Sequence, residues 1–241
     1  MSKGYNINVA GKGCVTPECR GSYVNILEAR PLPQSDVLAW GMQCVFKKSP
    51  VVEQWVDDLK QVYAKVLMDK FGKEKAKDVA QAILNKNSFP VRDGDKPEDS
   101  AALSNSEQLK GCYFINTNNR FRQPHVIGAM GKPVPPSILT LDDVYSGAYY
   151  RVMLEFWYYD TAGNKGISTS LEAIMKTRDG ENLGAGTSTS EASAAFSDFA
   201  DEASGMFSEN NTEDSVDDQS GNGAVSEGVG KKEPMEDFNF M

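Results

Sequence analysis

The segment GAYYRVMLEFWYYD, residues 147–160, most constrains the fold because it carries large apolar side chains at both even and odd positions. Successive side chains of a β-strand point to opposite faces of the sheet. The even positions from Ala148 to Tyr158 form a nearly pure apolar face, which suits the interior of a small sheet-based domain. A domain core needs only one such face. The odd positions form a second, amphipathic face that consists of Tyr149, Arg151, Met153, Glu155, Trp157 and Tyr159.

This second face has two interpretations. In the first, it packs beneath a helical insertion in the domain and has only a structural role. In the second, it is a platform for single-stranded nucleic acid, because bases stack on aromatic rings at about 1–3 kcal/mol each while a nearby arginine holds a phosphate. Every base has a π face, so such a platform binds without regard to sequence.

Four further segments have the composition of strands: residues 21–29, 37–48, 111–119 and 165–177. A helix is predicted from Ser49 and Pro50, which suit an N-cap and a first turn, to a stop at Gly72, and a second helix is predicted over residues 74–84. We therefore expect a mainly β fold of the α+β class. Its core is a small, partly open five-stranded barrel with a helical insertion at about residues 50–86.

The negative charge of the chain is concentrated at its C-terminal end. Thirteen of the 34 acidic residues and two of the 25 basic residues follow Ser190, so this segment carries −11 and the first 190 residues carry +2. From Gly184 onward the sequence is rich in Gly, Ser, Ala, Asn and acidic residues, which predicts disorder. The expected organisation is a flexible N-terminal segment over residues 1–20, a domain over residues 21–183 and a disordered acidic tail over residues 184–241.

Aromatic residues interrupt the acidic tail, and its last nine residues are EPMEDFNFM. One interpretation is that the tail only keeps the protein soluble. The other is that it recruits a partner, because an acidic segment with spaced aromatic residues can dock into a basic, apolar pocket. In that case Asp237, Phe238 and Phe240 are the expected partner-binding residues.

Basic residues flank the predicted platform. The segment NTNNRFRQPH alternates Arg120, Phe121 and Arg122. Lys47 and Lys48 close the second predicted strand, and Lys165 follows the turn TAGN. A domain of charge +2 lacks a diffuse positive field, so binding would depend on such local clusters. The expected nucleic-acid-binding residues are therefore Tyr149, Arg151, Trp157 and Tyr159, flanked by Arg120, Phe121, Arg122, Lys47 and Lys165.

The sequence supports other chemistries only weakly. Cys14 and Cys19 have C-x4-C spacing and Cys44 and His125 could complete a zinc set, but structural zinc sites usually have a second close ligand pair. No Ser or Cys nucleophile motif accompanies the single histidine. We therefore expect a protein that is not an enzyme and has no cofactor and no metal. Without a long apolar run or a hydrophobic signal core, it is expected in the cytoplasm with no membrane partner.

The order of several blocks resembles a family of phage-encoded single-stranded DNA-binding proteins of the OB fold, formerly known only as a domain of unknown function. The blocks are SYVNILEA (22–29), PVRDGDK (90–96), GCYFIN (111–116), VYSGAYYRVMLEFWYYDTAGNKGIS (144–168) and RDGENLG (178–184), within residues 20–186. The resemblance implies an OB-fold barrel that carries single-stranded DNA in a groove, and its GCYFIN block adds Tyr113 and Asn116 to the expected contacts. Related phage proteins end in an acidic tail with a terminal aromatic residue that contacts replication partners.

We therefore expect a DNA-binding protein that coats exposed single strands, independently of sequence, during phage DNA replication or recombination in the infected host cell. The acidic tail would compete with DNA and recruit replication proteins such as a DNA polymerase. The alternative is a phage protein–protein adaptor that uses the aromatic face and does not bind nucleic acid.

Overall fold

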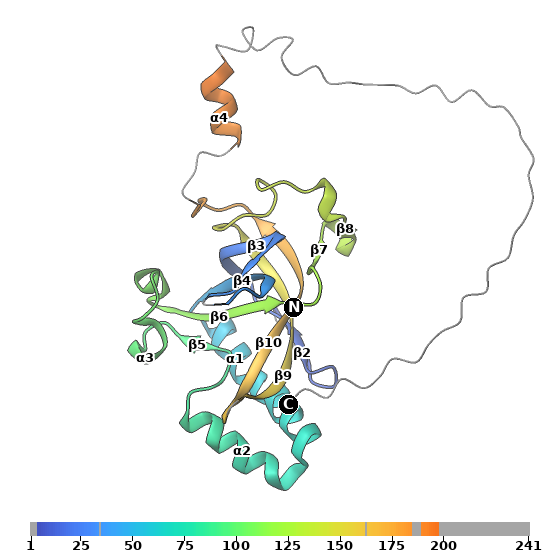
Figure 1. Cartoon of the computed structure of the whole chain (residues 1–241), viewed down its shortest axis with the longest axis vertical. Coiled ribbons are helices and arrows are strands. Elements are labelled where there is room, and N and C mark those ends of the chain that lie inside the picture. The colour runs from blue at the N-terminus through green and yellow to red at the C-terminus, as the bar shows by residue number, and fades with distance from the viewer. Residues whose placement is uncertain (1–3, 34, 162, 185–188, 198–241) are drawn as a thin grey trace, which may run out of the picture. The chain divides into compact units, whose positions relative to one another are not determined.

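In the computed structural model, five strands pair edge to edge around a closed ring (Figure 1). The strands are β3 (Cys19–Pro31), β4 (Leu38–Lys47), β6 (Cys112–Asn119), β9 (Tyr149–Thr161) and β10 (Asn164–Arg178). Their order around the ring is β3–β4–β6–β10–β9, and β9 pairs back with β3. Neighbouring strands are antiparallel except β6 and β10, which run parallel and pair at Asn118 and Ser170. All five predicted strands are confirmed.

The structure describes residues 4–33, 35–161, 163–184 and 189–197. The chain divides into two compact units, Met1–Ser193 and Ala194–Met241, and the ring belongs to the first. The predicted tail beyond residue 184 therefore lies largely outside the described residues. Within the described part of this tail, a short helix, α4 (Thr189–Phe196), forms where the sequence predicts disorder.

Five short strands extend the ring. They are β1 (Asn6–Asn8) and β2 (Gly13–Val15) beside β9, β7 (His125–Ile127) and β8 (Pro133–Val134) beside β10, and β5 (Arg92–Asp93) beside β6. The sequence analysis missed them because two or three residues are too few to show a period. The structure also differs from the flexible segment expected over residues 1–20, because β2 pairs with β9 from Gly13 to Val15 and β1 pairs with β2.

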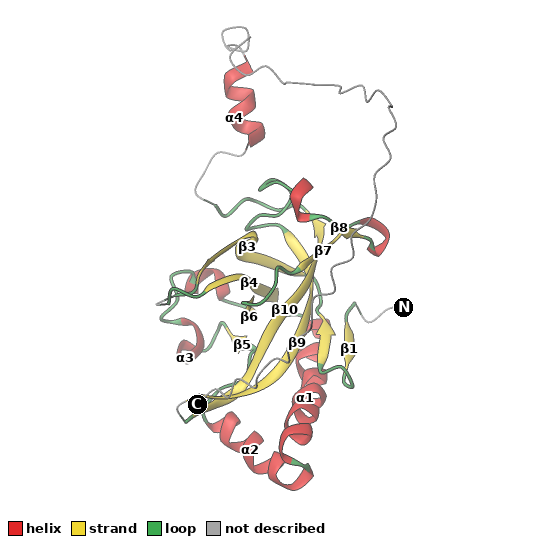
Figure 2. Cartoon of the chain, turned by 45° about the vertical axis from the view of Figure 1, so that its right-hand side comes forward, coloured by secondary structure: helices red, strands yellow, loops and turns green. Residues whose placement is uncertain are grey.

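Two helices form the predicted insertion between β4 and β6. Helix α1 (Pro50–Phe71) begins at Ser49, whose side chain accepts a hydrogen bond from the Val52 backbone N–H at 3.4 Å, and it ends at Gly72. Helix α2 (Lys73–Asn85) follows directly. In Figures 1 and 2 both helices lie at one end of the sheet, with β7 and β8 toward the other end. Both predicted helices are therefore confirmed. A further short helix, α3 (Pro97–Ser100), follows β5.

Helix α1 covers the core of the ring with its apolar side. Trp55 and Leu59 are fully buried, and the ring of Trp55 lies 4.7 Å from that of Phe46 on β4. Tyr63 meets Phe156 of β9 edge to face, with 5.3 Å between ring centroids. Aromatic pairs in these arrangements add to the stabilisation from burial alone. None of the helices in the described part of the chain is long and apolar enough to cross a membrane.

The residues VYSGAYY (144–150) form the turn into β9. The buried hydroxyl of Tyr150 accepts a hydrogen bond from the Tyr145 backbone N–H at 2.9 Å and donates one to the Tyr145 carbonyl at 2.8 Å. Gly147 has φ +112°, and an added Cβ would lie 1.9 Å from the Glu181 carbonyl oxygen. Only glycine fits this position. The turn thereby sets the register in which β9 enters the sheet.

Candidate nucleic-acid interface

The two faces of β9 are divided as its sequence predicts. The even residues Val152, Leu154 and Phe156 are buried, at 0–1% exposure, whereas Met153 and Trp157 on the odd side are 49% and 46% exposed. This period of two follows from strand geometry, since one side of β9 faces the core shared with α1. The odd face is therefore available for contacts outside the core.

The two ends of this odd face have different surroundings. At the start of β9, the guanidinium of Arg178 stacks 3.3 Å from the centroid of the Tyr149 ring and pairs with Glu18 at 3.0 Å. Arg151 donates hydrogen bonds to the backbone carbonyls of Gly4 and Thr16. Burial opposes ionisation of Glu18, but hydrogen bonds from Thr177 and Arg178 lower the pKa of its carboxyl group. Tyr149 and Arg151 thus help to hold the N-terminal strands.

At the other end, Trp157 and Tyr159 lie together, with 6.2 Å between their ring centroids. Trp157 lies six positions after Arg151, which is roughly 20 Å along a strand. The four residues predicted as one platform are therefore not one site in the structure. The Trp157 end lines a cleft.

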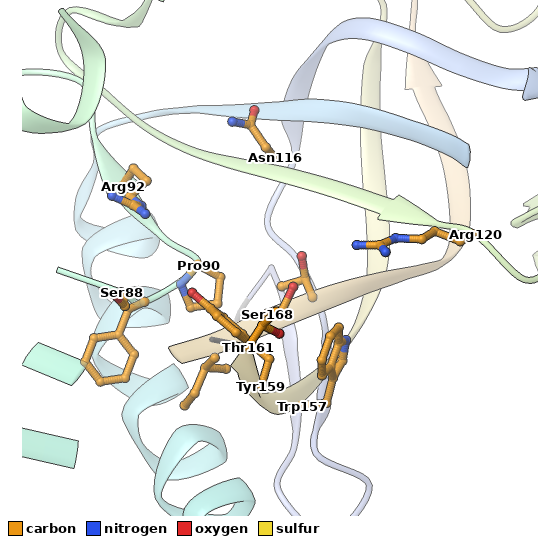
Figure 3. A pocket seen from close by; sticks show the side chains of 12 residues that line it. Ser88, Pro90, Arg92, Asn116, Arg120, Trp157, Tyr159, Thr161 and Ser168 are labelled. Atoms are coloured by element: carbon orange, nitrogen blue, oxygen red, sulfur yellow. The ribbon is translucent and has the colours of Figure 1, made fainter. Parts of the chain in front are cut away.

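This first cleft has a volume of about 350 Å³ and is lined by strands β6, β9 and β10 and by the segment before β5 (Figure 3). Figure 3 shows Arg120 and Trp157 on one side of the cleft and Arg92 with Ser88 and Pro90 on the other. Arg92 pairs at 3.0 Å with Asp99, whose side chain is only 2% exposed. In the part of the chain that the structure describes, no ion pair involves Arg120. Arg120 therefore brings an uncompensated charge to the cleft.

The loop that carries Arg120 is held by Asn119. The side-chain oxygen of Asn119 accepts hydrogen bonds from the backbone N–H groups of Phe121 at 3.0 Å and Arg122 at 3.1 Å. Its amide nitrogen donates to the Leu171 carbonyl at 3.1 Å. This turn, of the kind that asparagine favours, fixes the chain direction just after β6. It explains why the chain leaves the sheet after Asn119 and why Arg120, Phe121 and Arg122 lie in an exposed loop.

A second cleft, of about 750 Å³, lies over β3, β4 and β6. Its walls include Tyr23, which is 56% exposed, and Arg30. Gly41 on β4 lines it with bare backbone, because an added Cβ would lie 2.7 Å from the Thr117 carbonyl oxygen. Asn116 of β6 lines both clefts. We refer to the two clefts together as the Asn116 groove.

A chain of side-chain amides forms part of the floor. The side-chain Nδ2 of Asn105 donates a hydrogen bond to Oε1 of Gln43 at 2.6 Å. The side-chain Nε2 of Gln43 in turn donates one to Oδ1 of Asn116 at 3.0 Å. Gln43 and Asn116 are direct neighbours in the β4–β6 pairing. The groove thus combines half-exposed rings, guanidinium groups and amides. Such a surface can stack flat groups and bind anions.

The structure brings together four of the predicted contact residues, Asn116, Arg120, Trp157 and Tyr159, in the first cleft. The other seven line neither cleft. Tyr113 lies under the Lys48 ammonium at 4.8 Å, Lys165 pairs with Asp160 at 3.2 Å, and Arg122 pairs with Glu172. Phe121 is exposed in the loop after β6 and Lys47 is exposed at the end of β4, while Tyr149 and Arg151 have the contacts given above. The predicted partner-binding residues Asp237, Phe238 and Phe240 lie outside the described residues.

Part of the groove is not among the predicted contacts. Arg92 lies in the block PVRDGDK, which contributes to the family resemblance but to none of the predicted contacts. Tyr23 lies within the first predicted strand and Arg30 directly follows it, so an aromatic ring and a guanidinium group on this strand were the available signal. Gln43 and Asn105 carried no sequence signal of a contact. Their hydrogen bonding with Asn116 depends on the register of β4 and β6 and on a distant loop. Within the described part of the chain, no cluster of three or more His, Cys, Asp or Glu side chains is placed to bind a metal ion.

Comparisons with known proteins bear on the family and the fold of this chain. A family model described as the ssDNA-binding protein of Enterobacter phage Enc34 matches residues 12–206. The structure of the single-stranded DNA-binding protein from bacteriophage Enc34 in complex with ssDNA has a TM-score of 0.57 at 15% identity, covering 76% of this chain and 96% of that chain. A second structure of that phage protein has a TM-score of 0.55 at 18% identity, covering 80% of this chain and 95% of that chain. At these identities the likeness concerns the fold. No curated protein sequence matches the chain.

Proposed function

This chain belongs to the family of the Enterobacter phage Enc34 ssDNA-binding protein, a family of binding proteins and not of enzymes, and we propose that it binds single-stranded DNA along the Asn116 groove. The observation that carries the proposal is the first cleft. There the paired rings of Trp157 and Tyr159 and the uncompensated Arg120 lie beside Asn116, where the second cleft begins.

These groups match what a single strand requires. Bases stack on the two rings, phosphates contact Arg120, and the amides of Gln43 and Asn116 meet polar base edges. The first cleft favours DNA over a protein partner, because Ser, Thr, Asn and Arg side chains form most of its lining. Stacking dominates over hydrogen bonding in such sites, so binding is independent of sequence.

The strand order supports assignment of the ring to the OB fold. In that fold the second and third strands form the binding face, together with the loops between strands one and two and between strands four and five. Here the corresponding strands are β4 and β6, and both line the second cleft. The corresponding loop between β9 and β10 begins at Thr161, which lines the first cleft. We also place the start of this domain before residue 21, because β2 pairs with β9.

Replacing Arg120 by alanine is expected to weaken the salt dependence of DNA binding. Each phosphate neutralised on a single strand contributes about −0.7 to the slope of log affinity against log salt. The slope measured by fluorescence titration with a homopolymer DNA should therefore lose roughly 0.7 in magnitude. Arg122→Ala is the matched control, since Arg122 is paired with Glu172 and lines neither cleft.

An unchanged slope in Arg120→Ala, together with a reduced one in Arg122→Ala, would move the phosphate contact out of the groove. Failure of the unaltered chain to shift a labelled oligonucleotide in a gel would contradict the proposal altogether. It would favour the adaptor that the sequence left as an alternative.

The proposed biological role is to coat exposed single strands during phage DNA replication or recombination, in the cytoplasm of the infected host cell. The acidic tail competes with DNA for the domain and recruits replication proteins, such as a DNA polymerase. The charge distribution supports this division of roles, because −11 follows Ser190 and +2 precedes it. Carboxylates resemble phosphates in charge, and a tethered competitor acts at an effective concentration near the millimolar range.

Removing the residues after Ser193, where the first compact unit ends, is expected to tighten DNA binding. The gain should be larger at low salt, because screening weakens the competing attraction as salt rises. The measurement is a pair of binding isotherms for the full and shortened chains at two salt concentrations. Equal affinities of the two chains at both concentrations would contradict the competition.

A further inference from the structure

A groove lies between α1 and α2, outside the proposed DNA contacts. It has a volume of about 390 Å³. Its apolar lining residues recur about one helical turn apart, so one face of each helix forms a wall of the groove. They include Tyr63, Leu67 and Met68 of α1 and Ala76, Ala80 and Leu84 of α2.

The floor of this α1–α2 groove is buried and its rim is open to solvent. Leu67 and Ala76 are 1% and 5% exposed, whereas Met68 and Leu84 are 39% and 60% exposed. Contiguous exposed apolar surface marks an interaction site more often than an isolated exposed apolar residue does. The alanine side chains on α2 also leave room for another helix, since helices in contact lie about 8–10 Å apart.

Lysines give the groove a positive charge. Lys60, Lys73 and Lys77 contribute to its lining, and none of the described residues that line it is acidic. Lys60 pairs with Asp57 at 2.6 Å, but in the part of the chain that the structure describes no ion pair involves Lys73 or Lys77. A ligand that carries carboxylates beside large apolar side chains therefore complements the groove.

The same features argue against two other occupants. A second copy of the protein docked through this groove would bring its own lysines against Lys73 and Lys77, and like charges repel. A nucleic acid would find few open rings, because Tyr63 is 7% exposed and its ring stacks on that of Phe89 with 5.1 Å between centroids. The groove suits an acidic protein segment better than either.

We propose that the α1–α2 groove binds an acidic amphipathic helix of another protein. In recognition of this kind, apolar side chains at positions i, i+3 or i+4 and i+7 of the ligand helix enter a hydrophobic groove. Here they contact Met68, Ala80 and Leu84, and the acidic side chains beside them pair with Lys73 and Lys77. The bound state is a three-helix arrangement at one end of the sheet.

The place of the groove gives this docking a consequence, and that consequence rests on the proposed function. Phe89 lines both the α1–α2 groove and the first cleft. A protein held between the helices is therefore held beside the bound DNA strand. The lysines of the groove and the arginines of the cleft are different residues, so partner and DNA do not compete for one set of charges.

Binding of a designed peptide to the full chain tests the docking. The probe is a fluorescein-labelled helix of about 18 residues, or five turns, with leucines one turn apart on one face and glutamates on both sides of them. A second probe has lysine in place of each glutamate. Fluorescence anisotropy should show binding of the glutamate probe and weaker binding of the lysine probe. No binding of the glutamate probe, or equal binding of both, would overturn the proposal.

Charge reversal tests the lysine contacts. In the double variant Lys73→Glu/Lys77→Glu, affinity for the glutamate probe should fall roughly five-fold, the scale expected from losing two exposed ion pairs, and affinity for the lysine probe should rise. The matched variant Lys70→Glu/Lys75→Glu changes two lysines of the same helices that do not line the groove, and both affinities should stay unchanged. Equal losses in the two variants, with both folded by circular dichroism, would refute the lysine contacts.

Leu84→Ser tests the apolar contact. Leu84 is exposed, so its replacement should leave the fold intact while affinity for the glutamate probe falls roughly five-fold, as on loss of an interface anchor. Val51→Ser is the control, since Val51 is 48% exposed on α1 but does not line the groove. Binding that survives Leu84→Ser but is lost in Arg120→Ala would place the probe in the Asn116 groove and overturn the docking. Self-association of the chain that Leu84→Ser abolishes, measured by sedimentation, would assign the groove to a second copy and also overturn it.

Added homopolymer DNA should leave the glutamate probe bound, and displacement of the probe would contradict separate sites. A gel shift with a labelled oligonucleotide separates this proposal from the proposed function. A chain that binds the probe but does not shift the oligonucleotide would support the docking and refute the proposed function. A chain that shifts the oligonucleotide but does not bind the probe would refute the docking alone.

Discussion

Replacing Phe156 by alanine is expected to lower the free energy of unfolding by about 3–5 kcal/mol, the usual cost of a large-to-small change at a buried aromatic residue. Phe156 is 1% exposed and meets Tyr63 of α1 edge to face at 5.3 Å. The substitution therefore removes a contact between the ring of strands and its helical cover as well as burying less apolar surface. Equilibrium unfolding in urea, followed by circular dichroism, measures the change.

The neighbouring substitution Trp157→Ala is the stability control. Trp157 is 46% exposed and points away from the core, so its loss should cost well under the value for Phe156. If Trp157→Ala unfolded the domain while Phe156→Ala left it intact, the assignment of the two faces of β9 would be reversed.

The same Trp157→Ala variant is expected to weaken binding of single-stranded DNA by about 1–3 kcal/mol, which raises Kd roughly 5- to 150-fold. The loss should be similar for different homopolymers, because stacking depends little on base identity. Titration with fluorescently labelled oligonucleotides measures both affinity and base preference. It also avoids relying on tryptophan emission in a variant that lacks Trp157.

Tyr149→Ala is the matched control for binding. Tyr149 lies on the same face of β9 as Trp157, but it stacks under Arg178 and lines neither cleft. Its removal should leave affinity nearly unchanged. An equal loss in both variants would favour a continuous platform along β9 over binding in the Asn116 groove.

The long elements of this fold are predictable because their signals are local. A period of two over residues 148–160 and a helical period between Ser49 and Gly72 follow directly from strand and helix geometry. The short strands are not predictable in this way. β2 forms because Gly13 to Val15 pair with a free edge of β9, and that edge is present only once the sheet has assembled.

The candidate site was predictable only in part for a related reason. Residue type and strand parity identified Trp157 and Tyr159 as outward-facing rings. Parity does not show what else occupies the face, and Arg151 has the right type and direction but binds the carbonyls of Gly4 and Thr16. An arginine near an aromatic ring is a candidate phosphate ligand only if the fold leaves its guanidinium without a partner. That condition depends on contacts distant in sequence.

The hydrogen-bonded amides of Asn105, Gln43 and Asn116 have a consequence for what the groove floor can recognise. Each carboxamide has one end that donates and one that accepts, so rotation of all three by half a turn reverses the direction of the chain and keeps both hydrogen bonds. In one direction Asn116 offers a spare N–H to the groove, and in the other it offers a spare carbonyl oxygen. A floor with this reversible polarity meets a keto or an amino edge equally well, and so discriminates little among the four bases.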